Sequence, residues 1–382
     1  MNRFILFACL FFLVSCNMKS TKEGDVSPVN IDFASLQPAL DVSSISSTIN
    51  LIPLETNDSV IIDEPVQILI KKGYVYVADN SAVYKFDMEG RVLASLRHRG
   101  KAPDDYLSIT DIQPDETGNI WILSRNNQAL LNYSWDGTLL KKVKLNAWGA
   151  KIRLLGEGKM LLYIGNEKDK ENAHQLLLLD LNAETTEGRS LAIDELKANY
   201  LHVISRNNFS QGEETYFYQL FNDTIYTVPS SGVAVPAFRV CLDNKNIPAD
   251  FFQQNYQNIM DFYQNLFKGN YAYGINFFLK QEKQCWLSFF YNKHTYWWMT
   301  DGNRERASNV IVDDAYLFGY EISLDETLFF VQENSVVMPL YPQMIMEYAT
   351  GHLDMDKQAK IKERINYSGE EQNLVLLQIG MK

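Results

Sequence analysis

The sequence predicts an all-β protein, a six-bladed β-propeller with short helical insertions. Two observations carry this prediction. Short β-rich runs are broken by turns roughly every 8–12 residues, and they recur in groups about 40–50 residues apart, as propeller blades do. Gly73–Asp79 is echoed by Gly118–Ser124, and a weaker copy begins at Gly158. Glycine suits the intervening turns because it adopts a positive φ without a steric clash.

The later blades are less regular but follow the same pattern of short strands and turns. The strands expected for a fourth blade are residues 215–220, 224–228 and 237–242. A fifth blade is expected from residues 275–279, 285–291, 295–300 and 309–312, and a sixth from 316–322, 327–332 and 335–338. A closed ring leaves no edge strand free for aggregation, so we expect residues 49–54 to pair with residues 374–379.

Two segments interrupt the β pattern and are expected to be helical. Between residues 249 and 267, apolar side chains such as Phe252, Tyr256 and Tyr263 recur at helical spacing, which predicts an amphipathic helix. Residues 343–366 contain many lysines and methionines without clusters of β-branched residues, which predicts a second helical insertion. The expected domains are therefore a leader over 1–15, a lipidated tether over 16–47 and a propeller over 48–382.

Several short motifs support a resemblance to a known family. They are Ile52-Pro53-Leu54-Glu55-Thr56, Tyr76-Val77-Ala78-Asp79, the loop residues Gly100, Pro103 and Tyr106, and Asn222-Asp223-Thr224-Ile225-Tyr226. The chain resembles the bacterial six-bladed propeller lipoproteins related to NHL-repeat propellers, most clearly over residues 50–145. Where that family has Gly-x-Gly-Pro-Gly-Glu-Tyr, this chain has Ala102, Asp104 and Asp105 in place of two glycines and the glutamate. The resemblance implies a fold and an envelope location, but no particular activity.

The first sixteen residues predict export and membrane anchoring. Arg3 is followed by an apolar run that is too short to span a bilayer as a helix, which is typical of a secretory signal peptide. Leu13-Val14-Ser15-Cys16 resembles a lipobox, in which the cysteine becomes the lipidated N-terminus. Acyl chains such as palmitate on Cys16 would attach the protein to the membrane. We therefore expect an outer-membrane lipoprotein of the cell envelope, on either its periplasmic or its outer face.

The net charge and the cysteine content indicate which partners and cofactors to expect. The 382-residue chain has a formal net charge of −12, so it would repel the phosphate backbone and we expect no nucleic-acid partner. Cys241 and Cys285 remain after lipidation of Cys16, either as one disulfide or as two buried thiols. No spacing of histidine or cysteine predicts a metal site, and no cofactor is expected.

The loop that begins at Arg97 is the one concentrated basic patch of this acidic sequence. Arg97, Arg99 and Lys101 could bind an anionic group such as a uronate, a sulfate or a phosphate, since arginine offers a bidentate fork. Tyr106 lies just beyond them and could add a stacking surface. Alternatively, the loop is a solvated connection between blades and Tyr106 is a packing residue, which is the more common outcome.

A block of aromatic residues admits two interpretations. Trp286, Phe289, Trp297 and Trp298 belong to this block. They could stack on a carbohydrate, but aromatic side chains more often fill the gaps between blades. Because adjacent residues of a strand point in opposite directions, Trp297 or Trp298 is the member most expected to be exposed.

Two classes of function remain open. The leading hypothesis is a membrane-anchored propeller without catalytic activity that binds a glycan, a peptide or an envelope protein, because no nucleophile, metal set or cofactor loop is recognisable. The alternative is a hydrolase or lyase of the lactonase type, with Ca²⁺ in the channel held by carboxylates from several blades. The alternative requires carboxylates that converge at one mouth of the channel. The sequence identifies no catalytic residue for it.

Overall fold

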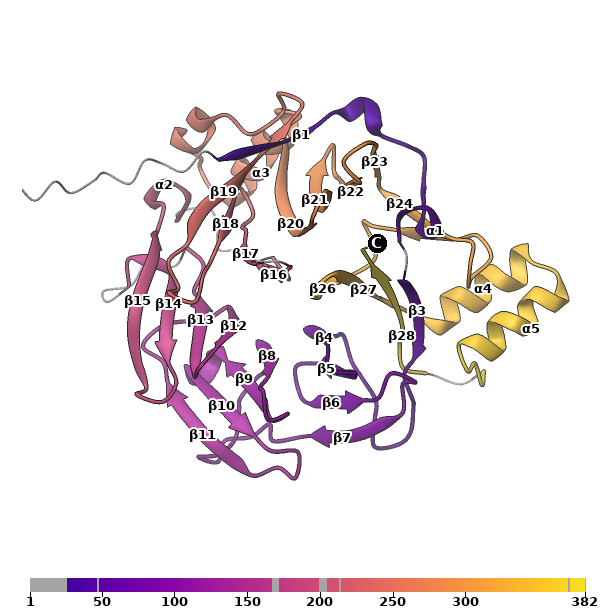
Figure 1. Ribbon diagram of the computed structural model, residues 1–382, viewed down its shortest axis with the longest axis horizontal. Coiled ribbons are helices and arrows are strands. Elements are labelled where there is room, and N and C mark those ends of the chain that lie inside the picture. The colour runs from indigo at the N-terminus through magenta and orange to yellow at the C-terminus, as the bar shows by residue number, and fades with distance from the viewer. Residues whose placement is uncertain are drawn as a thin grey trace, which may run out of the picture.

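The protein is a ring of β-sheets arranged around a central axis (Figure 1), and the region along this axis is named the channel below. The computed structural model describes residues 26–46, 48–166, 172–198, 205–212, 214–369 and 372–381. The leader and the lipidation residue Cys16 lie outside these described residues. Within the described part of the chain no helix is long and apolar enough to cross a bilayer.

The described strands form seven sheets, and counting each sheet as a blade gives seven blades where we predicted six. Blade I is β4 (Gln67–Lys71), β5 (Tyr74–Ala78), β6 (Val83–Phe86) and β7 (Val92–Leu96). Blade II is β8 (Asp111–Pro114), β9 (Ile120–Ser124), β10 (Ala129–Tyr133) and β11 (Leu139–Lys144). Blade III is β12 (Lys151–Gly156), β13 (Lys159–Tyr163), β14 (His174–Asp180) and β15 (Thr185–Ala192).

Of the remaining blades, IV, VI and VII each include one strand from the N-terminal segment, and blade V does not. Blade IV is β16 (Phe209–Gln211), β17 (Thr215–Phe217), β18 (Thr224–Thr227) and β19 (Val235–Leu242), with β1 (Ser27–Ile31) outside β19. Blade V is β20 (Ala272–Gln281), β21 (Gln284–Tyr291), β22 (His294–Thr300) and β23 (Glu305–Ser308). Blade VI has three strands, β2 (Leu40–Asp41), β24 (Val310–Asp313) and β25 (Tyr320–Ser323). Blade VII is β26 (Phe330–Val331), β27 (Ser335–Leu340), β28 (Val375–Gly380) and β3 (Thr48–Pro53).

The ring closes by pairing the two ends of the propeller, as the sequence predicts. Strand β3 is antiparallel to β28, with Pro53 opposite Val375 and Thr48 opposite Gly380. This pairing gives blade VII its outer strand from the N-terminal part of the chain. Residues 49–54 and 374–379 therefore meet as expected.

Residues 27–46, which we name the N-terminal strap, are ordered and do not form the tether that we predicted through residue 47. Strand β1 is parallel to β19, and β2 is parallel to β24. Between them lie η1 (Phe33–Ser35) and a hydrogen bond of 2.7 Å from the Gln37 amide to the Ala307 carbonyl on blade V. The strap continues into α1 (Val42–Ile45). It is held because its apolar side chains are buried in the core, and it covers the outer edges of blades IV to VI.

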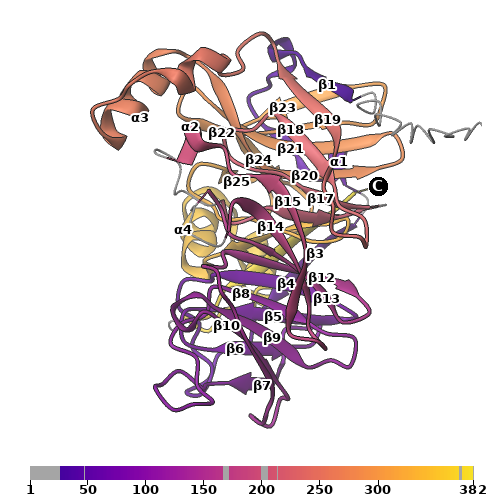
Figure 2. The same ribbon diagram turned by 90° about the vertical axis from the view of Figure 1, so that its left-hand side faces the viewer.

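The connections between strands give the ring two different faces. On the turn face, short turns join the innermost strand of a blade to its second strand, as at Lys72-Gly73 after β4. The insertion face carries the longer connections, including α2 (Glu195–Ala198), η3 (Ala249–Gln253) and α3 (Ile259–Lys268). It also carries α4 (Pro342–His352) and α5 (Met355–Arg364). Figure 2 shows α2, α3 and α4 on the same side of the disk.

Both predicted helical insertions contain helix, but each is divided. The segment predicted over residues 249–267 is a 3-10 turn, η3, followed by α3. Asn258 caps α3 by accepting hydrogen bonds from the amides of Met260 and Asp261, and such a cap explains why the helix begins where it does. The segment predicted over residues 343–366 is a pair of helices, α4 and α5. Pro342 occupies the first turn of α4, where a proline is tolerated.

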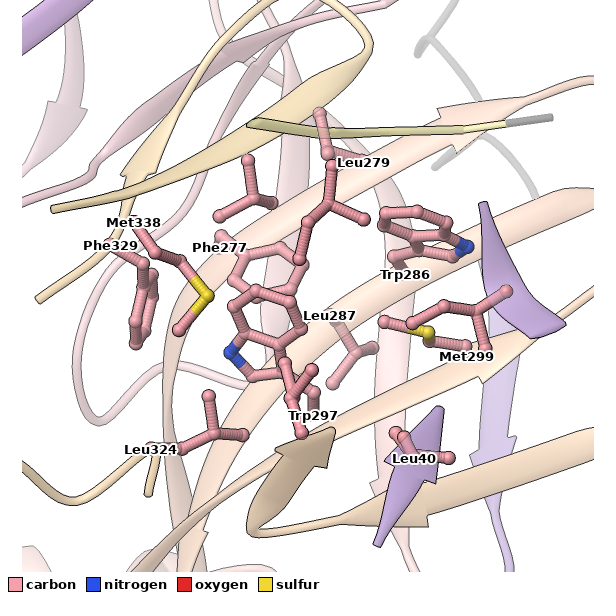
Figure 3. Packing of buried hydrophobic residues seen from close by; sticks show 14 of the residues in the cluster. Leu40, Phe277, Leu279, Trp286, Leu287, Trp297, Met299, Leu324, Phe329 and Met338 are labelled. Atoms are coloured by element: carbon pink, nitrogen blue, oxygen red, sulfur yellow. The ribbon is translucent and has the colours of Figure 1, made fainter. Parts of the chain in front are cut away.

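The aromatic block is buried within the largest core cluster, part of which Figure 3 shows. Trp297 is fully buried and meets Phe277 and Phe329 edge to face, with ring centroids 5.1 and 5.6 Å away. Trp298 is 2% exposed, so the expectation that one of these tryptophans is exposed is wrong. The reason is that a blade is covered by neighbouring blades on both faces, so alternation along a strand does not bring either side chain to solvent.

The two cysteines are unpaired. Cys241 is half-buried, Cys285 is buried, and both are free thiols. Burial raises the pKa of the Cys285 thiol to about 12, so it remains protonated and unreactive at neutral pH. Of the two possibilities that the sequence left open, the structure shows two free thiols.

Gly90 offers a test of how tightly the closing strand packs on blade I. Its φ is +81°, and a Cβ placed there would lie 2.0 Å from the carbonyl oxygen of Pro53 in β3. Gly73 has φ +77° but open space around the same position. We expect Gly73→Ala to lower the free energy of unfolding by about 1 kcal/mol, and Gly90→Ala to lower it clearly more. Urea titration of both variants measures the difference, and equal losses would contradict this close packing.

Candidate functional site

The innermost strands of adjacent blades are linked by side chains in the channel. Gln67 Nε2 donates to Asp111 Oδ1 at 2.8 Å, and the Ile152 amide donates to Asp111 Oδ2 at 2.9 Å, which joins blades I, II and III. Gln332 joins blade VII to blade I by donating to the Ile68 carbonyl and accepting from the Ile70 amide. These side chains pair backbone groups that face the channel and would otherwise lack a partner.

Residues 205–208, which we name the channel plug, bridge the channel at its insertion-face end. Arg206 reaches blade I, where it donates to the Pro65 carbonyl at 3.0 Å and pairs with Glu64 at 2.6 Å. Asn207 donates to the Phe329 carbonyl at 3.0 Å and accepts from the Val331 amide at 3.1 Å, so its side chain pairs with blade VII as a strand residue would. The plug precedes blade IV, so these contacts extend across the ring.

The other end of the channel opens into a cavity of about 730 Å³, which we name the channel-mouth pocket. Its charged lining residues are Lys71, Glu116, Arg153, Glu214 and Glu333. Its uncharged walls include Leu154, Leu155, Gln211, Thr215, Val228 and Val235. In blades I, II, III and VII these residues belong to the innermost strands and the turns that follow them, whereas blade IV also contributes residues of β17, β18 and β19. The volume lies in the range of small-molecule sites in proteins, roughly 300–1,000 Å³.

The two cations of the channel-mouth pocket are incompletely satisfied by the protein. Arg153 donates from Nη2 to the Gln211 side-chain oxygen at 3.0 Å, but its buried Nε has no hydrogen-bond partner. Among the described residues, no carboxylate lies within ion-pair distance of the Arg153 guanidinium. Lys71 Nζ donates to the Pro114 carbonyl at 3.1 Å and lies 3.8 Å from Glu116.

Burial makes the charged forms of both cations of the channel-mouth pocket less favourable. Burial lowers the pKa of the Arg153 guanidinium, while Glu333 acts in the opposite direction. Burial also lowers the pKa of Lys71, and the nearby positive charge of Arg153 lowers it further, against the effect of Glu116. Two cations held close together in a partly dehydrated pocket favour an anionic group between them.

A second cavity of about 360 Å³ lies between blades IV and V on the insertion face. Its lining includes Asp223 and Arg239, which pair with each other at 3.1 Å. This mutual pairing neutralises the charges that could recognise a ligand. The channel-mouth pocket, with its unpaired guanidinium, is therefore the stronger candidate.

The basic loop predicted as a ligand site lies on the insertion face, away from the channel-mouth pocket. Arg97 donates to the Ser59 carbonyl at 2.8 Å and to the Tyr84 hydroxyl at 3.1 Å. Arg99 donates to the Leu107 carbonyl at 3.3 Å, whereas Lys101 is exposed. The positions of Arg97 and Arg99 are thus explained by contacts within the protein, and ligand binding by this loop stays a prediction.

Tyr106 packs between blades I and II. Its side chain is fully buried, and its hydroxyl donates to the Ser81 carbonyl at 2.9 Å and accepts from the His98 amide at 3.1 Å. Burial raises the pKa of Tyr106 to about 12. The geometry is that of a packing residue and leaves no surface for stacking on a ligand.

Three carboxylates, those of Glu116, Glu214 and Glu333, line the channel-mouth pocket, so the lactonase-type alternative depends on whether such groups lie close enough together to share a metal ion. Asp111 is committed to the Gln67 side chain and the Ile152 amide, and its Oδ1 lies 4.0 Å from Lys151 Nζ. In the part of the chain that the structure describes, no group of three histidine, cysteine, aspartate or glutamate side chains could hold a metal ion.

Sequence reasoning missed Lys71 and Arg153 as site residues. Lys71 is the one charged residue of β4, whereas β12 contains both Lys151 and Arg153, and the two site residues lie in different blades. The available signal was the presence of a charged residue in an innermost strand, at Lys71 in β4 and at Arg153 in β12. In the folded protein both side chains line the channel-mouth pocket.

The fold and the pocket define a β-propeller with a ligand-sized cavity at the mouth of its channel. The chain belongs to the family described as a domain of unknown function, DUF4934, whose family model matches residues 28–379. No curated protein matches the chain.

Solved structures agree with the fold. A protein from Bacteroides fragilis that is named as exported aligns with a TM-score of 0.71 and 19% identity, covering 93% of this chain and 100% of that chain. A DUF4221 family member from Bacteroides vulgatus aligns with a TM-score of 0.51 and 9% identity, covering 88% of this chain and 98% of that chain. A virginiamycin B lyase from Staphylococcus aureus reaches a TM-score of 0.41 at 10% identity, covering 73% of this chain and 78% of that chain, which is too distant to support an argument about function.

Proposed function

We propose that this protein is an exported, membrane-anchored propeller that binds a small polar ligand in the channel-mouth pocket without transforming it. The observation that carries the proposal is the enclosed Arg153, whose Nε is buried without a partner. A guanidinium left in this state within a ligand-sized cavity favours a ligand that supplies the missing acceptor.

The location part of the proposal rests on the leader and on the similar exported protein. The apolar leader and Cys16 predict a lipoprotein of the cell envelope. The Bacteroides fragilis protein that covers the same propeller is named as exported, which supports the same compartment. Membrane attachment through Cys16 is part of the proposal, and mass spectrometry of the mature N-terminus tests it.

Binding at the channel-mouth pocket is tested by obstructing its mouth. Ser230 is exposed in the turn of blade IV that lines the pocket, so Ser230→Trp adds bulk at the entrance without disturbing the core. We expect this variant to lose at least about tenfold in affinity for any ligand found by thermal-shift screening of glycans, peptides and organic acids. Its melting temperature without ligand should be unchanged.

The matched control is Ser59→Trp, which adds the same bulk to an exposed position on the insertion face. We expect wild-type affinity from this control. If both variants bind equally well, the channel-mouth pocket is not the ligand site. Turnover of a lactone or glycan by the wild-type protein would contradict the non-catalytic part of the proposal and favour the hydrolase or lyase alternative.

A further inference from the structure

We infer that the ligand of the channel-mouth pocket is zwitterionic, a short peptide whose free carboxylate binds Arg153 and Lys71 while its ammonium group faces Glu214 and Glu333. This inference rests on the proposed function and specifies the chemistry of its ligand. It follows from the way the charges of the pocket are separated by depth.

The inner part of the channel-mouth pocket provides a carboxylate site. A guanidinium has five N–H donors in a planar fork that matches a carboxylate in a bidentate arrangement. Arg153 uses Nη2 for the neutral side chain of Gln211, and its Nε is buried without an acceptor. Lys71, the second cation, is half-buried and lines the same pocket.

The rim of the pocket provides acids for an ammonium group. Glu214 and Glu333 are exposed at the turns after β16 and β26, and within the described residues neither forms an ion pair. Glu116, the third acid, is already paired with Lys72 at 2.6 Å. Cations at depth and unpaired acids at the rim form an electrostatic dipole, and a ligand with the opposite arrangement of charges is complementary to it.

Other ligand classes fit this arrangement less well. A polyanion that entered toward Arg153 would be repelled by Glu214 and Glu333 at the rim. A neutral sugar would leave Arg153 without an anion, and no aromatic side chain among the described residues lines the pocket to stack on a sugar ring. Leucine and valine side chains of the wall, such as Leu155 and Val228, suit the apolar parts of a peptide. The Thr227 hydroxyl donates to the Val235 carbonyl at 3.5 Å and can still accept a hydrogen bond from a peptide amide.

The test uses the full-length protein and pooled dipeptides and tripeptides of random sequence in three forms. One pool has free termini, one is amidated at the C-terminus and one is acetylated at the N-terminus. Equilibrium dialysis with mass spectrometry measures binding. We expect peptides from the free pool to bind, with affinities about 10- to 100-fold lower for the same peptides when either terminus is blocked. Equal binding of all three forms, or no binding by any form, would overturn the inference.

Variants of the protein test which side chains bind the carboxylate of the peptide and which bind its ammonium group. Arg153→Gln should weaken the free peptide about 10- to 100-fold and leave the already weak amidated peptide unchanged. The double variant Glu214→Gln and Glu333→Gln should weaken the free peptide but not the acetylated one. Arg189→Gln, at an exposed position of β15, is the matched control for loss of a positive charge and should bind as wild type. Binding of the blocked peptides is measured with the wild-type protein. The inference can therefore be tested even if one of these variants folds poorly.

The outcome separates this inference from the proposed function. If Ser230→Trp abolishes binding of a neutral glycan and peptides do not bind, the channel-mouth pocket is a ligand site but the ligand is not zwitterionic. If no binding depends on Ser230, both the proposed function and this inference are wrong.

Discussion

Replacement of Trp297 by alanine is expected to lower the free energy of unfolding by about 3–5 kcal/mol, the usual effect of truncating a large aromatic residue in a packed core. Trp297 is fully buried and meets Phe277 and Phe329 edge to face. The closed ring leaves little freedom for the blades to collapse into the space. Urea denaturation followed by circular dichroism measures the change.

Trp297→Phe is the matched control for this prediction. The indole Nε1 is buried without a hydrogen-bond partner, so phenylalanine removes an unsatisfied N–H group while it keeps an aromatic ring in the cluster. We therefore expect less than half of the loss that alanine causes. A loss below about 1 kcal/mol for Trp297→Ala would show that the aromatic cluster is not the main stabilising contact between these blades.

Asn207→Leu is expected to lower the free energy of unfolding by about 2–4 kcal/mol. The Asn207 side chain pairs with both the Phe329 carbonyl and the Val331 amide, and leucine of similar size leaves both groups without a partner. An unsatisfied buried backbone group costs about 1–3 kcal/mol. Because this pairing links blade IV to blade VII across the channel, the loss should also be visible as faster hydrogen exchange of the Val331 amide.

The control for Asn207 is Asn126→Leu. Asn126 is exposed and forms one hydrogen bond of 3.1 Å to the Ser108 hydroxyl, so its replacement should change stability by no more than about 0.5 kcal/mol. If the two variants are equally stable, the channel plug does not hold the ring together, and the insertion-face end of the channel is open to exchange.

The parts of the fold that the sequence predicted correctly depend on local patterns. The strands of blades I and II follow the repeated glycine turns at Gly73 and Gly118, where the structure shows positive φ values of 77° and 88°. Closure by residues 49–54 and 374–379 followed from the need to leave no open edge. Both arguments use information that lies within a few residues or applies to every closed ring.

The errors arose where distant segments pair. Residues 309–312 and 316–322 were divided between two expected blades, but strands β24 and β25 form a blade of their own with β2. Strand β2 consists of Leu40 and Asp41, far away in sequence, within the segment that we predicted to be a tether through residue 47. Parallel pairing along an outer edge leaves no local signal, so the N-terminal strap and the seventh blade could not be predicted from periodicity.

The residues of the channel-mouth pocket were missed for the same reason, because they are far apart in the sequence and meet only in the folded ring. Arg97, Arg99 and Lys101 are close in sequence and therefore drew attention, although Arg97 and Arg99 bond to the protein itself. Arg153 and Lys71 belong to different blades, and only closure of the ring brings them to one pocket. A site assembled from single charges on separate repeats has no linear motif.

The direction of β1 determines on which face of the ring the N-terminal segment enters, and therefore on which side of the channel-mouth pocket a membrane anchor would lie. Strand β1 is parallel to β19, and Ser27 is opposite Phe238, three residues after Val235 in the wall of the channel-mouth pocket. The chain thus enters the propeller at the turn face. If Cys16 carries the lipid, the ten residues before Ser27 span at most about 35 Å when fully extended. The pocket would then open beside the bilayer, and this narrow gap would act as a size filter that admits short, diffusible molecules and holds back large polymers.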